Sequence, residues 1–171
     1  MKTLEVIYND KGVALANTSQ FDKDSILAKM KKNDCVVRAI ACSFDISYEA
    51  AHTYVKELFK REDKKGTRAV VLKMRGLSEA FRKSVKEMGI TIEEGSNKRL
   101  QMMWPYKVKG ETKYAQYTTG KFLKDPRYSK GTYLILVSGH AFTIKDGVVY
   151  GNEDDATTLR ARIEQAFKIG E

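Results

Sequence analysis

The sequence has few cysteines and no long apolar segment. Its 171 residues include only two cysteines, Cys35 and Cys42, which are too few for the disulfide framework of a small secreted protein. No uninterrupted apolar run approaches the ~20 residues that a membrane-spanning helix requires. The first residues include an acidic side chain and soon become polar, unlike a secretory signal. These absences predict a cytoplasmic protein that has no membrane segment.

Basic residues are numerous, but they do not form uninterrupted blocks. Lysine and arginine number 31 against 22 acidic residues, which gives a net charge of +9. Such an excess attracts polyanions, including nucleic acid and acidic proteins. Acidic residues lie between most of the basic clusters, so no basic tract has the character of a nucleic-acid-binding arm. The composition leaves two interpretations open: lysines that maintain solubility, and a basic surface for an acidic protein or nucleic acid.

The length and the hydrophobic content predict a single domain. Hydrophobic residues make up 42% of the chain, which excludes wholesale disorder. A chain of 171 residues leaves little room for two independent cores. We expect one domain over residues 1–171, with a helical part at about 25–90 and a sheet part at about 100–171.

Helical patterns are concentrated in the first half of the chain. Apolar residues recur at four-residue steps after Asn33 and Asp34, and either residue can cap a helix that has Cys35 in its first turn. The expected elements of this half are a hairpin of residues 4–8 and 13–16, an irregular segment at 18–32, a helix from about 33, a helix from Ser47 to 59, and a helix at 78–88.

The second half is rich in apolar strands joined by turn residues. Residues 131–137 are apolar on both faces, which is typical of a central strand. The other expected elements are a short strand at 90–92, a helix at 121–124, strands at 140–144 and 148–150, and a strand at 159–169 whose pattern also fits a helix. Helices first and an antiparallel sheet last predict an α+β fold.

Cys35 has the setting of a nucleophilic thiol. The thiolate is the reactive form, and the first turn of a helix favours the anion through its unpaired amides and its positive dipole end. A nearby imidazolium stabilises a thiolate and can later donate a proton to a leaving group. Of the two histidines, His52 lies within a predicted helix and is more consistent with packing or surface exposure. His140 opens a strand directly after Ser138-Gly139.

Asn152 can approach the imidazole of His140 from the neighbouring strand. It lies twelve residues after His140, just past the strand at 148–150. A hairpin turn at Asp146-Gly147 returns that strand beside His140. A side-chain amide there would orient the ring and select its tautomer, as the third member of a catalytic triad does. The spacing equally allows an ordinary strand end at His140 and a turn residue at Asn152.

Two stretches, around Cys35 and around His140, form a recognisable pattern. One reads Asn-Asp-Cys-Val-Val-Arg-Ala-Ile at residues 33–40, and the other comprises residues 122–125, 130–144 and 146–150. They resemble the nucleophile helix and the histidine-bearing hairpin of papain-like cysteine peptidases, particularly the small C39-like branch. The order of cysteine, histidine, then asparagine or aspartate is also similar to that of the family.

The resemblance implies a papain-like fold. In that fold, a helical half that carries the cysteine packs on an antiparallel sheet that carries the histidine, with a cleft between them. The resemblance also implies a thiol protease or a related hydrolase, which acts by thiol-based acyl transfer on a protein or peptide substrate. Cys35 then matches the nucleophile, His140 the general base and acid, and Asn152 the orienting residue.

The sequence departs from the family pattern at two positions. C39-like sequences often have an aspartate directly after the strand aromatic, where this chain has Gly151, so Asp154 and Asp155 are alternative orienting residues. The family usually has an oxyanion-donating glutamine about six residues before the nucleophile, where this chain has Lys29. The nucleophile's backbone amide, helped by Asn33 or Lys29, would then serve as the donor. Loss of one such donor typically costs ~10²–10³ in rate, so the alternative is a weak or inactive scaffold that binds an acidic protein or nucleic acid.

No metal ion and no cofactor is expected. Cys35 and Cys42 lie seven residues apart on one predicted helix, which is about 10 Å along its axis and too far for two thiolates on one zinc ion. Cys42 is expected to be a buried apolar residue. The alternative nucleic-acid surface would combine aromatic and basic side chains, namely Trp104, Tyr106, Tyr114 and Tyr117 with Lys98, Arg99, Lys107 and Lys113.

Overall fold

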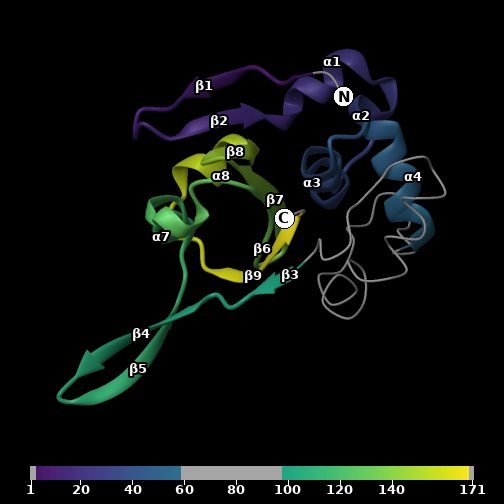
Figure 1. Cartoon of the computed structure of the whole chain (residues 1–171). Helices are drawn as coiled ribbons and strands as arrows, with labels where there is room; N and C mark the ends of the chain where they lie inside the picture. Colours follow the sequence, from purple (N-terminus) through teal and green to yellow (C-terminus); the bar gives the residue numbers. More distant parts are fainter. Residues whose placement is uncertain (1–2, 59–97, 170–171) are drawn as a thin grey trace.

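The computed structural model describes residues 3–58 and 98–169. Helices dominate the first of these stretches and strands the second, so the architecture is mixed α+β, as the sequence predicts (Figure 1). The helix expected at 78–88 and the strand expected at 90–92 lie outside the described residues. None of the helices in the described stretches combines the length and the apolar character needed to cross a membrane.

The N-terminal stretch begins with a hairpin and continues with helices. Its elements are β1 (Val6–Tyr8), β2 (Ala14–Asn17), η1 (Thr18–Gln20), α1 (Phe21–Asp24), α2 (Ile26–Met30), α3 (Cys35–Phe44) and α4 (Tyr48–Leu58). The expected hairpin and the helices from about 33 and 47 are confirmed. The irregular segment expected at 18–32 is wrong, because side-chain oxygens start short helices there. Asn17 accepts from the Ser19 N–H, and Ser25 Oγ accepts from the Ala28 N–H.

The C-terminal stretch consists mainly of strands. Its elements are β3 (Lys98–Leu100), β4 (Met103–Val108), β5 (Glu111–Gln116), α7 (Thr119–Lys124), η3 (Pro126–Tyr128), β6 (Thr132–Val137), β7 (His140–Lys145), β8 (Val148–Gly151), α8 (Glu153–Thr157) and β9 (Ile163–Ile169). The strands predicted at 131–137, 140–144 and 148–150 are confirmed. The C-terminal segment is a strand, and a short helix follows its predicted cap, Thr118. The hairpin of β4 and β5 and the helix α8 were not predicted.

The described strands form one large sheet and one separate ribbon. The sheet has the order β1-β2-β8-β7-β6-β9-β3, and β4 pairs with β5 alone. The expected antiparallel sheet is confirmed for the C-terminal strands β3 and β6 to β9, but the sequence did not predict two features of the full sheet. The N-terminal hairpin belongs to the same sheet, and β2 pairs with β8 in parallel, with Asn17 beside Gly151. Local sequence patterns do not reveal this pairing, because most of the chain lies between the two strands.

The sheet is covered on both faces. In β6, Leu134 and Leu136 belong to the core under α3 and α4, whereas Tyr133, Ile135 and Val137 belong to the core under α7 and α8. Successive side chains of a strand point to opposite faces, so a central strand between two helical layers must be apolar throughout. In Figure 1, the α3 and α4 layer lies on one side of the sheet, and α7 and α8 lie on the other.

A buried polar contact holds α3 on β7. The Thr143 hydroxyl is fully buried and donates to the Ala39 carbonyl at 2.8 Å. The same oxygen lies 2.8 Å from Ser43 Oγ, which supplies the proton of the second bond because a hydroxyl has only one to donate. Since Cys35 begins α3 and His140 begins β7, this contact fixes the two candidate residues relative to each other.

Candidate active site

Cys35 is the first residue of α3, and it is partly exposed. Amides in a first helical turn have no intrahelical acceptor and lie at the positive end of the helix dipole. The expected side-chain cap is not formed by Asp34, the residue at the capping position. Asp34 Oδ2 instead accepts from Arg38 Nε at 2.9 Å and from the Tyr48 hydroxyl at 2.6 Å. Asp34 therefore ties the start of α3 to α4.

Arg38 ties the start of α3 to the segment that precedes it. Its guanidinium donates to the Thr18 carbonyl at 2.6 Å, to Asp22 Oδ1 at 2.8 Å and to the Ala28 carbonyl at 3.2 Å. Burial alone would lower the pKa of Arg38, but Asp22 and Asp34 outweigh burial and raise it. The arginine therefore stays charged and holds the short helices between β2 and α3 in place.

A tight turn sets the position of His140. The residue pairs with Val137 across the turn between β6 and β7, where Gly139 has a φ of +67°. Glycine adopts such a positive φ without steric cost. The imidazole stacks on Phe142, with ring centroids 6.0 Å apart and an interplanar angle of 25°. His140 is thus anchored at the end of the sheet, while 26% of its side chain remains exposed to the solvent.

The His140 ring contacts both a carboxylate and the thiol. Its Nε2 lies 2.8 Å from Oδ1 and 2.9 Å from Oδ2 of Asp155. Cys35 is hydrogen-bonded to the same ring, and with Nε2 occupied by Asp155, Nδ1 is the nitrogen left for the thiol. The hydrogen bond to Asp155, and then that to Cys35, raise the pKa of His140 to about 10 against the opposing effect of burial. The ring is therefore protonated at neutral pH.

Asp155, and not Asn152, contacts the His140 ring. The Asn152 side-chain oxygen accepts from the Asp155 N–H at 3.0 Å, and Asp155 Oδ2 accepts from the Asn152 N–H at 2.8 Å. This reciprocal capping box starts α8 directly after β8. The expected role of Asn152 is therefore corrected: its side-chain oxygen caps the helix, and its backbone N–H holds the Asp155 carboxylate in place. Asp154, the other alternative, is exposed on α8.

Asp155 occupies the space that a side chain at position 151 would fill. A Cβ atom on Gly151 would lie 2.2 Å from Asp155 Oδ2 and 3.1 Å from Phe142 Cβ. The C39-like sequences that this chain resembles often have an aspartate at this position, directly after the strand aromatic. In this chain the carboxylate comes from α8, four residues later, and reaches His140 through the space that the glycine leaves empty.

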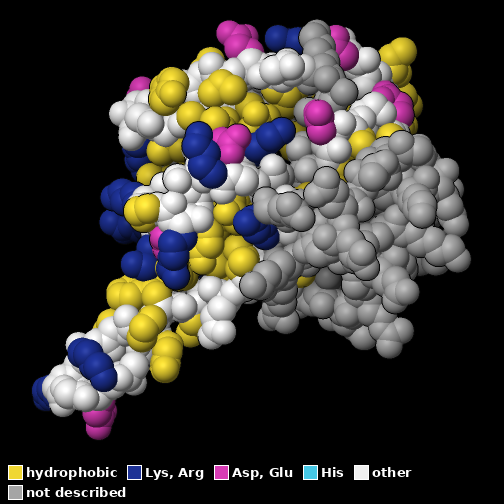
Figure 2. Space-filling view, in the orientation of Figure 1, with side chains coloured by type: hydrophobic (Ala, Val, Ile, Leu, Met, Phe, Trp, Pro, Cys, Tyr) yellow, Lys and Arg dark blue, Asp and Glu magenta, His cyan; other side chains and the backbone are white. Residues whose placement is uncertain are grey.

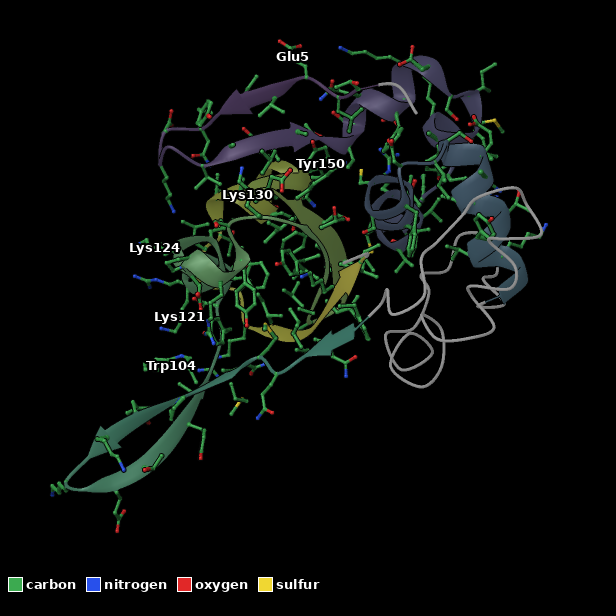
Figure 3. All side chains as sticks on the ribbon, viewed as in Figure 1. Glu5, Trp104, Lys121, Lys124, Lys130 and Tyr150 are labelled. Carbon is green, nitrogen blue, oxygen red and sulfur yellow. The ribbon has the colours of Figure 1, made fainter. Side chains whose placement is uncertain are left out.

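Cys35 and His140 line one cavity of about 490 Å³, here called the Cys35 cavity. Its volume falls in the range of roughly 300–1,000 Å³ that is common for ligand sites. Its walls come from the end of β2, the start of α3, the start of β7 and the end of β8, and they include Tyr150, which is labelled in Figure 3. Of the two expected oxyanion donors, Asn33 lines the cavity, whereas Lys29 is exposed on α2 and does not line it.

The N-terminal hairpin contributes to the Cys35 cavity, which sequence reasoning missed. Asn17, Thr18 and Ser19 line it, because β2 ends beside the end of β8. The Thr18 hydroxyl donates to the Gly151 carbonyl at 3.4 Å, and the Asn17 oxygen accepts from the Ser19 N–H at 2.9 Å. The Asn17 side chain retains its amide N–H groups as donors. No local signal marks these residues, since their position depends on the pairing of two distant strands.

The second histidine and the second cysteine have structural roles. His52 is buried on α4, and its ring stacks on Tyr48 with centroids 6.3 Å apart and an interplanar angle of 26°. Cys42 is 2% exposed in the core under α3, and burial raises the pKa of its thiol to about 12. Of the two interpretations left open for His52, packing and surface exposure, the structure shows packing, and the expectation that Cys42 is a buried apolar residue is confirmed.

Comparison of the chain with models of protein families, with curated proteins and with solved structures finds no match in any of the three. We therefore infer the function from the contacts among Cys35, His140 and Asp155 and from the cavity that the first two residues line.

Proposed function

We propose that this chain is a cysteine-dependent hydrolase of the papain-like type, which cleaves amide bonds in a protein or peptide. The observation that carries the proposal is the position of the His140 ring, which hydrogen-bonds to Cys35 and to Asp155 beside an open cavity. The packing of a helix that starts at a cysteine against a strand that starts at a histidine also supports it.

In the resting site, the proton resides on His140. The pKa of about 10 keeps its ring protonated at pH 7, and the Asp155 carboxylate balances the positive charge. An imidazolium beside a thiol stabilises the thiolate, which is the nucleophilic form. The start of α3 adds the partial positive charge of its free amides. In this proposal the attacking form of Cys35 is a thiolate, which the protonated His140 ring stabilises as its counter-charge.

Acylation begins when the Cys35 thiolate attacks the carbonyl carbon of the scissile amide. A sulfur–carbon bond forms, and one electron pair of the carbonyl moves to the oxygen. When this tetrahedral intermediate collapses, the carbon–nitrogen bond breaks and His140 transfers its Nδ1 proton to the leaving amine. The products are a free amine, a thioester on Cys35 and a neutral imidazole whose Nε2–H still donates to Asp155.

Deacylation uses the neutral imidazole as a base. The Cys35 contact is one of the two interactions that raise the pKa of His140, so its loss in the thioester lowers that pKa. The ring can then accept a proton from water while the water oxygen attacks the thioester carbonyl. The sulfur–carbon bond breaks, the carboxylic acid product leaves, and the thiolate–imidazolium pair is restored. Asp155 keeps the ring oriented in both steps.

The oxyanion of each tetrahedral intermediate needs hydrogen-bond donors. The Cys35 backbone N–H lies in the first helical turn and can supply one of them. Asn17 and Asn33 both line the Cys35 cavity, and either side-chain amide can supply a second. Lys29 is not retained as a candidate, because it lies outside the cavity.

Alkylation with iodoacetamide at about pH 6 tests the thiolate–imidazolium pair. Cys35 should react rapidly, and His140→Ala should slow this reaction at least about ten-fold because the thiolate loses its counter-charge. The alkylation rate of Cys35 is compared between the wild-type protein and His140→Ala. A comparison with Cys42 would be less informative, because burial alone protects that cysteine from the reagent. Equal Cys35 rates in the wild-type protein and in His140→Ala would contradict the pair.

Hydrolysis itself can be measured with a pooled library of fluorescence-quenched peptides. The wild-type protein should cleave members of the library, and Cys35→Ala should abolish cleavage, because the other cysteine, Cys42, is buried in the core. Asp155→Asn should retain the fold and lower the rate. Cleavage that survives in Cys35→Ala, or a library left intact by a wild-type protein whose Cys35 alkylates rapidly, would reject amide hydrolysis.

A further inference from the structure

The β4–β5 ribbon, residues 103–116, is an exposed feature on another part of the molecule. Its two strands pair with each other and with no other described strand, and Figure 1 shows the ribbon projecting from the body of the protein. Large side chains are exposed on it, including Met103 at 42%, Tyr106 at 36% and Tyr114 at 62%. An isolated two-stranded ribbon is marginally stable in water, and clustered exposed apolar side chains mark interaction sites.

Two cavities meet at the base of the ribbon, and Trp104 and Lys121 line both of them. One has a volume of about 790 Å³ and the other of about 580 Å³. The Lys121 ammonium lies 4.0 Å from the centroid of the Trp104 ring, and the Trp104 and Tyr106 rings are 5.5 Å apart. Figure 3 shows Lys121 and Lys124 extending from α7 beside the base of the ribbon.

The walls of these two cavities are basic. Lys124, Arg127 and Arg160 line the larger cavity, and Arg162 lines the smaller one. Arg127 is already paired with Asp125 at 2.8 Å and holds the pKa of that carboxyl well below its usual range. In the described part of the chain, Lys124 and Arg160 make no ion pair with a carboxylate. Figure 2 shows Lys and Arg side chains gathered over α7, and further ones near the tip of the ribbon.

We propose that the two cavities and the adjoining face of the ribbon bind single-stranded nucleic acid. Trp104 and Tyr106 are two residues apart on β4 and therefore face the same side, where unpaired bases can stack on their rings. Lys121, Lys124 and Arg160 then attract the phosphates of the same strand. The surface combines aromatic rings with cations that lack carboxylate partners. A single strand matches this combination, because its bases can stack on the rings and its regularly spaced phosphates can pair with the cations.

Other ligands match only half of this surface. An acidic protein would neutralise the cations but would make no specific use of the adjacent, mutually tilted Trp104 and Tyr106 rings. A nucleic-acid duplex keeps its bases stacked on one another and offers none to Trp104. An apolar peptide would cover the rings and leave Lys124 and Arg160 without counter-charges.

The surface is separate from the proposed catalytic machinery. Trp104 packs on the core under α7, whereas Cys35 packs on the core under α3, on the other face of the sheet. None of the residues that line the two ribbon cavities lines the Cys35 cavity. Nucleic-acid binding is therefore an additional property, and its failure would leave the proposed hydrolase untouched.

Trp104 reports binding directly, because it is the only tryptophan of the chain. Titration with an oligo-dT of about 20 nucleotides at about 50 mM NaCl should quench its fluorescence in a saturable way, as a stacked base does. With three or four phosphates neutralised, the logarithm of the binding constant should fall against the logarithm of the salt concentration with a slope of about −2 to −3.

Charge reversals at matched positions locate the surface. Lys124→Glu with Arg160→Glu should weaken binding at least about ten-fold and reduce the salt slope by about 1.4, as expected for two lost phosphate contacts. Lys23→Glu with Lys56→Glu is the control, because these exposed lysines lie on α1 and α4 and their reversal changes the net charge equally. The control should change the affinity less than about two-fold. Circular dichroism checks that both variants are folded.

Several results would overturn the proposal. They are an absence of saturable quenching at micromolar protein, equal losses in the two charge-reversal pairs, and tighter binding of duplex DNA than of oligo-dT. Poly-glutamate that binds as tightly as oligo-dT, with the same dependence on Lys124 and Arg160, would assign the surface to an acidic protein.

The variant Trp104→Phe should retain binding, because it preserves an aromatic ring. Its binding is measured by the fluorescence anisotropy of a labelled oligonucleotide.

Discussion

The absence of a side chain at Gly151 allows the Asp155 carboxylate to reach His140. Alanine there would place its Cβ 2.2 Å from Asp155 Oδ2, a distance at which one of the two groups must move. Gly151→Ala should therefore displace the carboxylate and lower peptide hydrolysis about 10²-fold, the loss that a misplacement of about 1 Å can cause. The pKa of His140 should fall as well, because Asp155 is the main cause of its elevation, and NMR titration of the ring measures this.

The reciprocal change tests whether the space itself is the determinant. In Gly151→Asp combined with Asp155→Ala, a carboxylate grows from β8 into the volume that the Asp155 carboxylate vacates. We expect this double variant to hydrolyse peptides at least about ten-fold faster than Asp155→Ala alone, since the orientation of His140 is restored. The role of this space would be refuted if the double variant hydrolysed peptides no faster than Asp155→Ala and if Gly151→Ala were fully active.

His140 also links the stability of the fold to pH. Its pKa rises from 6.5 to about 10 in the folded protein, through Asp155 first and Cys35 second. Because the folded state binds this proton more tightly than the unfolded state, His140 stabilises the fold fully below pH 6.5. This contribution is lost as the pH rises to about 10. Urea unfolding between these pH values should show a steeper loss of free energy for the wild-type protein than for His140→Gln, and parallel curves would contradict the linkage.

At the scale of elements, the packing of α3 on β7 decides whether Cys35 and His140 meet. Thr143→Val preserves the shape of the side chain but removes the donor to Ala39 and the acceptor for Ser43. Buried groups that lose their partners cost about 1–3 kcal/mol, so the free energy of unfolding should fall by about that amount. Peptide hydrolysis should fall too, because α3 can then shift on the sheet.

An exposed threonine provides the control for this substitution. Among the residues that the structure describes, the Thr53 hydroxyl bonds only to the Glu49 carbonyl of its own helix, at 3.0 Å, and water can replace that bond. Thr53→Val should therefore change the free energy of unfolding by less than about 0.5 kcal/mol. If chemical denaturation gave the same result for Thr143→Val, the buried contact would have no role in holding α3.

The elements that the sequence predicts well are those whose signals are local. The continuous apolar run of β6, the Asp146-Gly147 turn between β7 and β8, and the four-residue apolar steps of α3 all act within a few residues. Both Asp146 and Gly147 have positive φ, at 50° and 78°, as a tight hairpin turn requires. These local features place Cys35 and His140 at the ends of their elements, which is why both could be singled out from the sequence.

The elements that were missed have weak or non-local signals. The helix α8 has only five residues, too few for a helical period, although the spacing of Asn152 and Asp155 fits a capping box and could have revealed it. The β4–β5 ribbon is mostly exposed on both faces, so its strands lack the alternation that a half-buried sheet imposes. The role of Asp155 depended on α8 and therefore remained one alternative among three.

At the scale of the whole molecule, the two halves of the chain meet at the helix that carries Asp155. Asn9 Nδ2 donates to the Ala156 carbonyl at 2.9 Å, and Lys11 Nζ donates to the Thr157 carbonyl at 2.7 Å. The turn of the N-terminal hairpin therefore supports the last turn of α8, while the opposite end of β2 lines the Cys35 cavity. The candidate site is thus a property of the complete sheet and not of one local motif.

The two proposed sites have no lining residue in common, and this separation makes a prediction about the whole molecule. Saturating oligo-dT should leave the rate of Cys35 alkylation at about pH 6 unchanged within about two-fold, because the ribbon cavities share no lining residue with the Cys35 cavity. Sites without shared partners are expected to behave additively. The measurement compares alkylation with and without oligonucleotide in the wild-type protein and in Lys124→Glu with Arg160→Glu. Protection of Cys35 that disappears in the charge-reversed variant would show that nucleic acid bound at the ribbon reaches or alters the Cys35 cavity, and the two sites would then have to be treated as one.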